Sequence, residues 1–494
     1  MTDKISSAEP QPHAEPELLK EEERVEARSS AFKKELGLTD LALTQILFIV
    51  GLPWVGIAGK LGPSHIIFWL LAILLFYLPS AVVVIYLNRL MPLEGGLYQW
   101  AKLGFNEMMG FMVAWNLWLF VILNTSEIGI QAATSLAYAL GPRAAWVASS
   151  KWLISLISTL LIGMLIVVST LGLGVGKWVH KAGAVMMFII FATLLVLPIL
   201  NLARGQITEY HPLQTAMPTV SLLSLNILGK LGFGALGGFE YVAIHAGECR
   251  DPVRSIGRSV MLAAPVIALM FILGTSSVIA LIRPDDIDLI GPIPQVLSVG
   301  FQSFGIVSYI VPIAILAFLW IRIAQASVMF TGNTRLPMVA GWDHLLPEWF
   351  TRLHSRYRTP VNSTLFVGAM TLALGLAGLI GVGEQEAFQL LWNASGVFYA
   401  LTYLVMFAIP LVGLRRAGQP APLWLKAAAG SGFLMTFLYV SLAVFPIVRV
   451  ESQGAFALKI IAVIVAANII GAAIFIIAER KRKTDRAKTA APAQ

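Results

Sequence analysis

Long apolar segments recur through the whole chain, and they constrain its fold more than any other feature. Only 13% of the 494 residues are charged, against about 25% in soluble domains. A helix needs about 20 apolar residues to cross a bilayer, and a backbone in lipid must satisfy its own hydrogen bonds. We therefore expect an all-α polytopic membrane protein whose twelve transmembrane helices lie near residues 38–59, 64–88, 106–140, 151–172, 180–203, 222–247, 259–282, 301–331, 360–381, 386–412, 423–446 and 456–478.

Lysine and arginine are distributed unevenly between the two sides of these segments. With the N-terminus inside, the inner segments hold 26 of the 35 basic residues and the outer loops hold 7, while Lys230 and Arg322 lie within the membrane. The positive-inside rule then predicts a multi-pass protein of the cell (inner or plasma) membrane with both termini cytoplasmic. This distribution also accounts for the net charge of +8 without a nucleic-acid partner.

The two ends of the chain are polar. Residues 1–35 contain an acidic run and lack the apolar stretch of a signal peptide, which predicts a disordered cytoplasmic tail. Residues 479–494 are predicted to form a basic cytoplasmic tail, and residues 36–478 the twelve-helix domain. The single cysteine, Cys249, excludes an intramolecular disulfide and a cysteine metal cluster.

Two of the apolar segments contain residues that interrupt a helix near its middle. Four glycines and a carboxylate lie between Gly232 and Glu240, and the first segment contains Gly51, Pro53 and Gly56. Glycine lowers the cost of leaving helical geometry, and proline removes a helical hydrogen bond. Segments one and six are corresponding members of two five-helix halves. The pair therefore indicates a 5+5 inverted-repeat transporter with its site at the midplane, with repeats near 38–203 and 222–412 and two extra helices over 423–478.

Several ordered motifs resemble the amino acid–polyamine–organocation (APC) superfamily. Three motifs resemble its sixth helix and the loop that follows, namely Gly237-Gly238-Phe239-Glu240, Ala246-Gly247-Glu248 and Asp251-Pro252-Val253-Arg254-Ser255-Ile256. Residues 92–100 resemble its segment between helices two and three, and 333–337 its loop after helix eight. The matches span roughly residues 36–412. The resemblance implies the LeuT-like fold, with helices one, two, six and seven rocking against helices three, four, eight and nine.

The resemblance also implies that amino acids bind at the two helix breaks. Backbone groups freed there face the substrate carboxylate and amine, and ionisable residues within the membrane are functional candidates. The predicted substrate-binding residues are Gly51, Leu52, Pro53, Trp54, Val55, Gly56, Asn124, Glu127, Phe233, Gly234, Ala235, Leu236, Gly237, Arg322 and Asn393. The alternative for the charged groups is structural pairing, of Glu127 with Arg322 or of Glu240 with Lys230.

The first break departs from the family pattern. The family's Gly-x-Gly aligns with Gly51-Leu52-Pro53, and Pro53 has no N–H, so one expected carboxylate donor is missing. The N–H groups of Trp54 and Val55 are possible substitutes. A proline followed by an aromatic residue at this place is closer to the polyamine-uptake branch. An amino acid is therefore the first predicted substrate, and a polyamine or other organic amine is the alternative.

Glu240 and Lys230 are assigned to coupling or gating. Glu240 follows the break in helix six and matches a family glutamate, and desolvation at this depth disfavours its charged form. We hypothesise that it senses or carries a proton. Lys177 and Lys181 lie at the start of helix five rather than inside it, and sodium binding has no clear signature. A proton-coupled symporter or an exchanging antiporter is favoured.

No sequence pattern of an enzyme is present, since there is no metal-ligand cluster, phosphate loop or nucleophile motif. The sequence predicts a permease without a cofactor, a monomer or homodimer surrounded by membrane lipid, that carries a small-molecule substrate. A channel would not need paired interruptions. A substrate sensor on a transporter fold is a further alternative. The identity of the substrate, the coupling ion and the direction of transport do not follow from the sequence.

Overall fold

The structure is a computed structural model that describes residues 23–24, 27, 34, 36–51, 53–305, 307–380, 383–414, 420–447 and 452–490. Leu52 and most of the predicted N-terminal tail lie outside the described residues. The regular secondary structure of the described part is helical, and an isolated bridge joins Leu36 to Cys249. Eleven described helices are long and apolar enough to cross a membrane, and a twelfth span results when one bent pair is counted as a single span. The predicted all-α polytopic fold is confirmed.

The first five spans follow the predicted order. They are built from α2 (Leu38–Ile49) and α3 (Pro53–Gly59); α4 (His65–Ala72), the π-helix η2 (Ile73–Tyr77) and α5 (Leu78–Leu90); α7 (Glu107–Ser126) and α8 (Ile128–Leu140); α10 (Lys151–Leu171); and α11 (Leu173–Ala203). The short helices α6 (Leu97–Gly104) and α9 (Trp146–Ser149) lie in the connections.

The remaining spans complete the second half and the two added helices. They are built from α12 (Leu222–Gly229), η4 (Lys230–Ala235) and η5 (Phe239–Glu248); α13 (Pro252–Leu281); α15 (Val307–Asn333) and α16 (Arg335–Trp342); α17 (Val361–Gly378); α18 (Glu384–Ala408) and η9 (Ile409–Gly413); α20 (Leu423–Ala443); and α21 (Gln453–Ala490). A further helix, α14 (Pro292–Phe301), lies between α13 and α15.

Helix one is broken where Gly51 and Pro53 predict it. The last bond of α2 runs from Val50 N–H to the Ile46 carbonyl, and the axes of α2 and α3 differ by 47°. Pro53 is the first residue of α3, a position where its missing N–H costs no helical hydrogen bond. Trp54 N–H donates to the Gly51 carbonyl at 3.0 Å, which closes the turn between the two half-helices.

Helix six is irregular over most of its length. The α-helix ends at Gly229, a π-helical turn follows, and the chain leaves helical geometry before continuing as the 3₁₀ helix η5. Gly238 has φ 136°, a conformation that residues with a Cβ rarely adopt, and a Cβ there would lie 2.6 Å from the Phe48 ring. The predicted break is present, and it continues past the glycines into η5.

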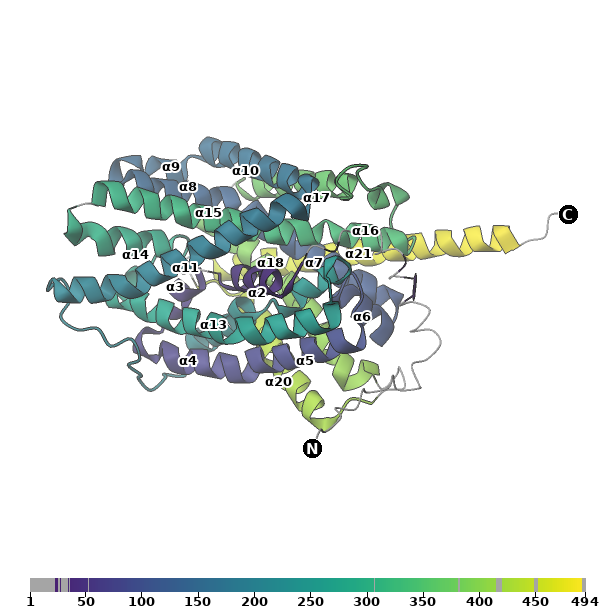
Figure 1. Cartoon of the computed structure of the whole chain (residues 1–494), viewed down its shortest axis with the longest axis horizontal. Helices are drawn as coiled ribbons and strands as arrows, with labels where there is room; N and C mark the ends of the chain where they lie inside the picture. Colours follow the sequence, from purple (N-terminus) through teal and green to yellow (C-terminus); the bar gives the residue numbers. More distant parts are fainter. Residues whose placement is uncertain are drawn as a thin grey trace, which may run out of the picture.

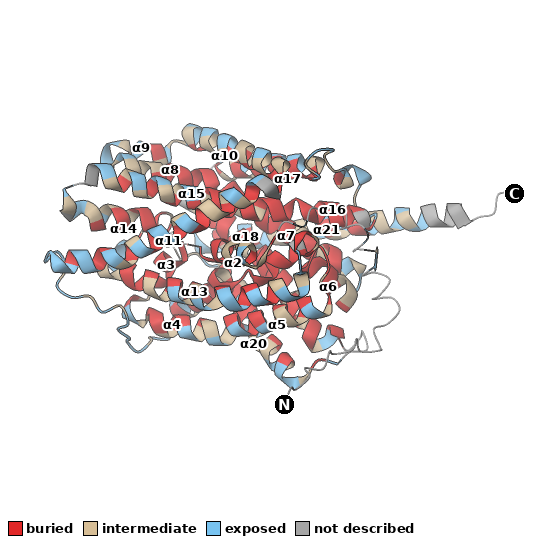
Figure 2. Cartoon of the chain, viewed as in Figure 1, coloured by how far each residue is buried: buried red, intermediate tan, exposed pale blue. Residues whose placement is uncertain are grey.

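The broken helices lie in the centre of the bundle. Helix α2 packs against α11, α13 and α15 near the middle of the view in Figure 1, and Figure 2 shows buried residues concentrated in this region. The outer helices α10, α11 and α17 carry exposed apolar side chains, as lipid-facing helices do. The last helix, α21, reaches Ala490, so the first part of the predicted basic tail is a helical extension that projects from the bundle.

Candidate functional site

A cavity of about 80 Å³ lies between the two helix breaks. Six transmembrane spans contribute to its wall. They are helices one, three, six and eight, helix ten (α18), and helix eleven (α20), which contributes Tyr439. Eight of the residues predicted to bind substrate line it, namely Gly51, Trp54, Asn124, Glu127, Phe233, Gly234, Gly237 and Arg322. The structure therefore gathers residues from helices one, three, six and eight around one small space, as the inverted-repeat interpretation predicts.

The other described residues of the predicted set lie outside this wall. Pro53, Val55 and Gly56 are buried in α3, where Gly56 packs against Pro292. Ala235 and Leu236 are also buried, away from the cavity, and Asn393 lies next to the lining residue Trp392. Their roles in substrate binding remain predictions. They lie off the cavity wall because each half-helix turns only one face toward the break, whereas the sequence prediction included every residue around it.

The indole of Trp54 lies in a niche formed by two glycines. A Cβ on Gly51 would lie 2.6 Å from Trp54 Cδ1, and a Cβ on Gly234 would lie 2.5 Å from Cη2 at the other end of the ring. Real Cβ atoms do not approach other atoms so closely. The two glycines therefore let an aromatic side chain lie between the breaks of helices one and six, where it forms part of the cavity wall.

One carboxylate and one guanidinium line the cavity. Arg322 Nη2 lies 3.6 Å from Glu127 Oε1, and Gln131 donates to the same oxygen at 2.9 Å. Glu127 follows the last residue of α7 at the join with α8, and its second oxygen, Oε2, has no hydrogen-bond partner among the described residues. The structural pairing of Glu127 with Arg322 is thus present, and it lies within the candidate site.

Gln325 joins this pair to the break in helix one. Its amide nitrogen donates to the carbonyls of Leu47 and Val50 at 2.8 and 2.7 Å, while its oxygen accepts from Arg322 Nη1 at 2.6 Å. Two backbone acceptors at the end of α2 are therefore already satisfied by a side chain. The predicted set omitted Gln325. Its spacing of three residues from Arg322 places the two on one helical face and is the pattern that identifies it.

Glu240 is bound by two tyrosines of α18. Tyr399 and Tyr403 each donate a hydroxyl hydrogen bond to its carboxylate, and Tyr403 also accepts from Gly238 N–H at 2.6 Å. Tyr399 lines the cavity, whereas Glu240 does not. A single side chain therefore connects the buried carboxylate to the candidate substrate site. The predicted set omitted both tyrosines, although they lie four residues apart on one face of helix ten.

The alternative pairing of Lys230 with Glu240 was wrong. Lys230 Nζ donates to Asn393 Oδ1 at 3.1 Å and lies 5.9 Å from the centre of the Tyr439 ring. Ten residues of regular helix would already separate Lys230 and Glu240 by about 15 Å along the axis. Lys230 instead joins helix six to helices ten and eleven.

Three of the family-like motifs meet at the predicted cytoplasmic end of helix six. Arg335 Nη2 forms a buried ion pair with Glu248 Oε1 at 2.6 Å, and Glu94 accepts the Gly247 N–H at 2.7 Å. Burial, together with the Glu248 carboxylate, raises the pKa of Glu94 to about 8. Leu36 pairs by backbone hydrogen bonds with Glu248 and Arg250, on either side of buried Cys249. We name Glu94, Glu248 and Arg335 the inner cluster.

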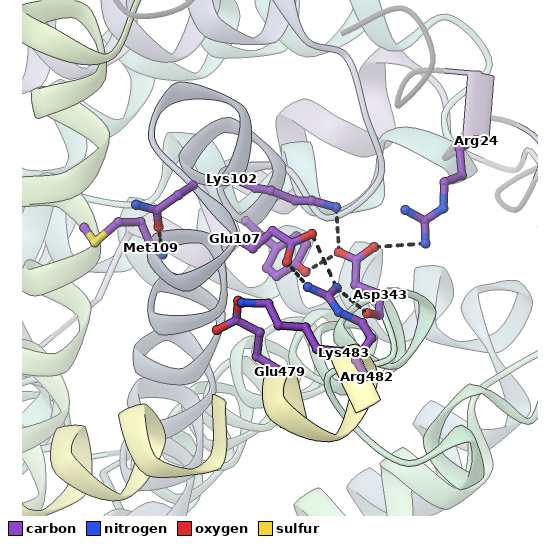
Figure 3. Close-up of polar contacts among 10 residues, drawn as sticks. Arg24, Lys102, Glu107, Met109, Asp343, Glu479, Arg482 and Lys483 are labelled. Carbon is purple, nitrogen blue, oxygen red and sulfur yellow. Dashed lines mark hydrogen bonds and ion pairs between the residues drawn. The ribbon is translucent and has the colours of Figure 1, made fainter. Parts of the chain in front are cut away.

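A second polar cluster ties both ends of the described chain to the bundle. Asp343 accepts hydrogen bonds from Tyr98 and Lys102 and lies 3.4 Å from Arg24 (Figure 3). Arg482 of α21 pairs with Glu107 and donates to the Asp343 carbonyl. Residues near the N-terminus and in the C-terminal helix therefore contact the same side of the molecule.

The fold and the two broken helices define a transporter of the LeuT fold. The crystal structure of MhsT in complex with L-phenylalanine has a similar fold, with a TM-score of 0.59 and 16% sequence identity over 83% of this chain and 99% of that one. The family model for amino acid permeases matches residues 36–472. The chain belongs to the amino acid permease family, and its relatives are transporters rather than enzymes.

Three curated relatives illustrate the range of this family. An uncharacterized transporter of Legionella pneumophila is 24% identical over 76% of this chain and 80% of its own length. The branched-chain amino acid permease BcaP of Bacillus subtilis is 25% identical over 73% of this chain and 80% of its own. The probable agmatine/putrescine antiporter AguD of Lactococcus lactis is 20% identical over 77% and 79%.

Proposed function

We propose that the protein is a secondary active transporter that carries amino acids across the cell membrane by alternating access. The observation that carries this proposal is the pair of opposite charges in the cavity wall, with Arg322 Nη2 and Glu127 Oε1 3.6 Å apart. An amino acid is a zwitterion, so its carboxylate matches the guanidinium and its amine matches the carboxylate. Glu127 retains an oxygen without a hydrogen-bond partner among the described residues to accept the amine.

The groups at the helix-one break favour a substrate amine that binds to Glu127 rather than to the backbone carbonyls of helix one. Gln325 already occupies the Leu47 and Val50 carbonyls, and Pro53 provides no N–H. Binding groups that the family takes from the backbone are supplied here by side chains of helices three and eight. In this proposal Arg322 and Glu127 orient the substrate, while Trp54, Phe233 and Tyr399 enclose its apolar part.

Proton coupling is proposed to act through Glu240. No basic side chain of the described residues forms an ion pair with its carboxylate, and its hydrogen bonds come from two tyrosines. A change of its protonation alters what Tyr399 can donate toward the cavity. Uptake into proteoliposomes across an imposed pH gradient tests this role. Glu240→Gln is expected to abolish the stimulation by an inward proton gradient, and wild-type pH dependence in this variant would contradict the proposal.

The test of the substrate class uses purified protein and a panel of ligands. Ligands that bind the folded state raise its apparent stability by mass action. Amino acids are expected to shift the unfolding temperature and to drive saturable uptake and counterflow in liposomes. Binding without flux would identify a sensor, and a large unitary conductance would identify a channel. Both outcomes would contradict the proposed function.

An organic amine is the second candidate, because Glu127 lies in a cavity with several aromatic rings. Trp54, Phe120 and Trp392 line the wall with it, and aromatic faces attract ammonium groups. The discriminating variant is Arg322→Gln. It is expected to abolish amino acid uptake, whereas uptake of a diamine such as putrescine would survive. Stabilisation of the wild-type protein by putrescine but by no amino acid would replace the first proposal with the second.

A further inference from the structure

A second, larger cavity lies away from the candidate transport site, between α7, α17, α18 and α21. Its volume is about 490 Å³, and its wall consists of apolar and aromatic side chains. Its residues come from positions 111–123, 336–350, 366–374, 398 and 463–474. We name it the lateral cavity. Neither Glu127, Arg322 nor Glu240 lines it, so it has no part in the transport mechanism described above.

The lateral cavity opens toward the surface that faces lipid. Both α17 and α21 pack against α7, and α7 forms the floor between them. Phe366 of α17 and Val463 and Ile470 of α21 belong to the wall and are exposed, whereas Phe111 and Phe398 at the back are buried. An apolar recess within a membrane span excludes polar ligands, because their polar groups would lose hydrogen bonds there.

Basic residues lie beyond one end of this cavity. Its wall ends at Ile474 on α21, and the same helix continues through Arg480, Lys481 and Lys483. Arg482 is anchored to Glu107 of α7, so the first part of this extension is held at the bundle before the helix projects from it (Figure 3). Lys483 pairs with Glu479, while Arg480 and Lys481 are exposed.

The loop between α16 and α17 lies on the other side of this end of the lateral cavity and adds a further positive charge. Phe350 lines the cavity, exposed Arg352 follows it, and half-exposed Trp349 precedes it, after the acidic Glu348. Tryptophan at such a level is typical of the boundary between lipid and water. The side chains around this end are therefore predominantly basic, on the side predicted to be cytoplasmic, where bilayers carry anionic lipids.

We propose that the lateral cavity binds an acyl chain of an anionic phospholipid, whose head group lies against Arg480 and Lys481. The apolar wall accommodates the chain, and the basic extension of α21 selects the charge of the head group. Such a lipid packs simultaneously on α7, α17 and α21 and joins the last helix to the rest of the bundle.

The experiment compares two lipids that carry the same diazirine-labelled acyl chain, phosphatidylglycerol and phosphatidylcholine, with the full-length protein in lipid vesicles. After photolysis, labelled peptides are mapped by mass spectrometry. Phosphatidylglycerol is expected to label peptides 111–123, 336–350 and 463–474 several-fold more than phosphatidylcholine does. Equal labelling by the two lipids, or labelling spread evenly over all lipid-facing helices, would overturn the proposal. Crosslinks between two protein copies at these peptides, in place of lipid labelling, would also overturn it.

Two adjacent residues of α21 give a matched pair of variants. Ala467 lines the lateral cavity, whereas Ala466 is exposed on the same helix outside its wall. Ala467→Phe is expected to fill the space and reduce labelling of these peptides at least fivefold, and Ala466→Phe to leave it unchanged. The double variant Arg480→Gln/Lys481→Gln is expected to reduce phosphatidylglycerol labelling to the level of phosphatidylcholine. Each variant counts as folded if its unfolding temperature in detergent equals that of the wild-type protein. Unchanged labelling in the folded Ala467→Phe variant would refute the site.

Discussion

The buried ion pair of the inner cluster allows one prediction with a calculable size. Arg335 and Glu248 are 1% and 7% exposed in their side chains, and their atoms lie 2.6 Å apart. Glu248→Gln removes the negative charge and leaves the guanidinium buried without it. Removing one partner of a buried pair costs about 3–5 kcal/mol. The structure is closed at this side, since Arg335, Glu248 and Cys249 are all buried. The cost falls on this closed conformation, because an opened one lets water reach Arg335.

The expected consequence is a large increase in the population open at this side. At about 1.4 kcal/mol for each factor of ten, even the lower value changes the closed-to-open ratio on the order of 100-fold. The chain's single cysteine reports on this opening, because Cys249 is buried directly beside Glu248. Burial raises the pKa of its thiol, so alkylation in the closed conformation is slow.

The assay is the rate of maleimide labelling of Cys249 in membranes at constant pH. Glu248→Gln is expected to accelerate labelling at least tenfold. The double variant Glu248→Gln/Arg335→Leu is expected to recover most of the wild-type rate, because the buried guanidinium that Glu248 balances is then also absent. Glu386→Gln, which removes an exposed ion pair with Lys459, is the control and should change nothing. A wild-type labelling rate in folded Glu248→Gln would refute the reasoning.

Three further predictions follow from the contacts of the inner cluster, the cavity wall and Glu240. The pKa of Glu94 is raised to about 8, so the closed conformation binds an extra proton between roughly pH 4.5 and 8 and loses stability as pH rises through this range; Glu94→Gln should flatten the pH dependence of Cys249 labelling once the rate is divided by that of a free thiol at the same pH. Gly234→Ala places a methyl group against the Trp54 ring and should abolish binding in thermal-shift assays, whereas Gly430→Ala, in open space on α20, should not. Tyr399→Phe removes one hydrogen bond from Glu240 and should shift the pH profile of uptake by about one unit while leaving expression unchanged, and an unshifted profile would contradict the proposed link.

The parts of the fold and site that depend on local chemistry could be predicted from the sequence. Glycine and proline alter backbone preferences wherever they occur, so the breaks near Gly51 and Gly234 were identifiable without tertiary information. Apolar length and the distribution of basic residues likewise predicted the spans and a topology. The family-like motifs added the positions of Glu94, Glu248 and Arg335, but not their contact.

The contacts that depend on helix rotation could not be predicted in this way. Gln325 and Tyr399 reach the site because helices eight and ten turn particular faces toward the breaks. The spacing of their polar residues marks one face of each helix, but it does not say what that face contacts across the bundle. The proposed pairing of Lys230 with Glu240 failed for a related reason. The actual partners, Asn393 and the two tyrosines, come from a helix more than 150 residues away in the sequence.

The niche of Trp54 has a consequence for how proteins of this kind diverge. Gly51 and Gly234 have no room for a Cβ while the indole is present, whereas Trp54 itself can become smaller without a clash. A change of substrate size through this wall must therefore begin at Trp54, and side chains can appear at the two glycines only afterwards. The three positions form one evolutionary unit with a fixed order of substitution. Descendants with a larger residue at Gly51 or Gly234 should have lost the tryptophan first.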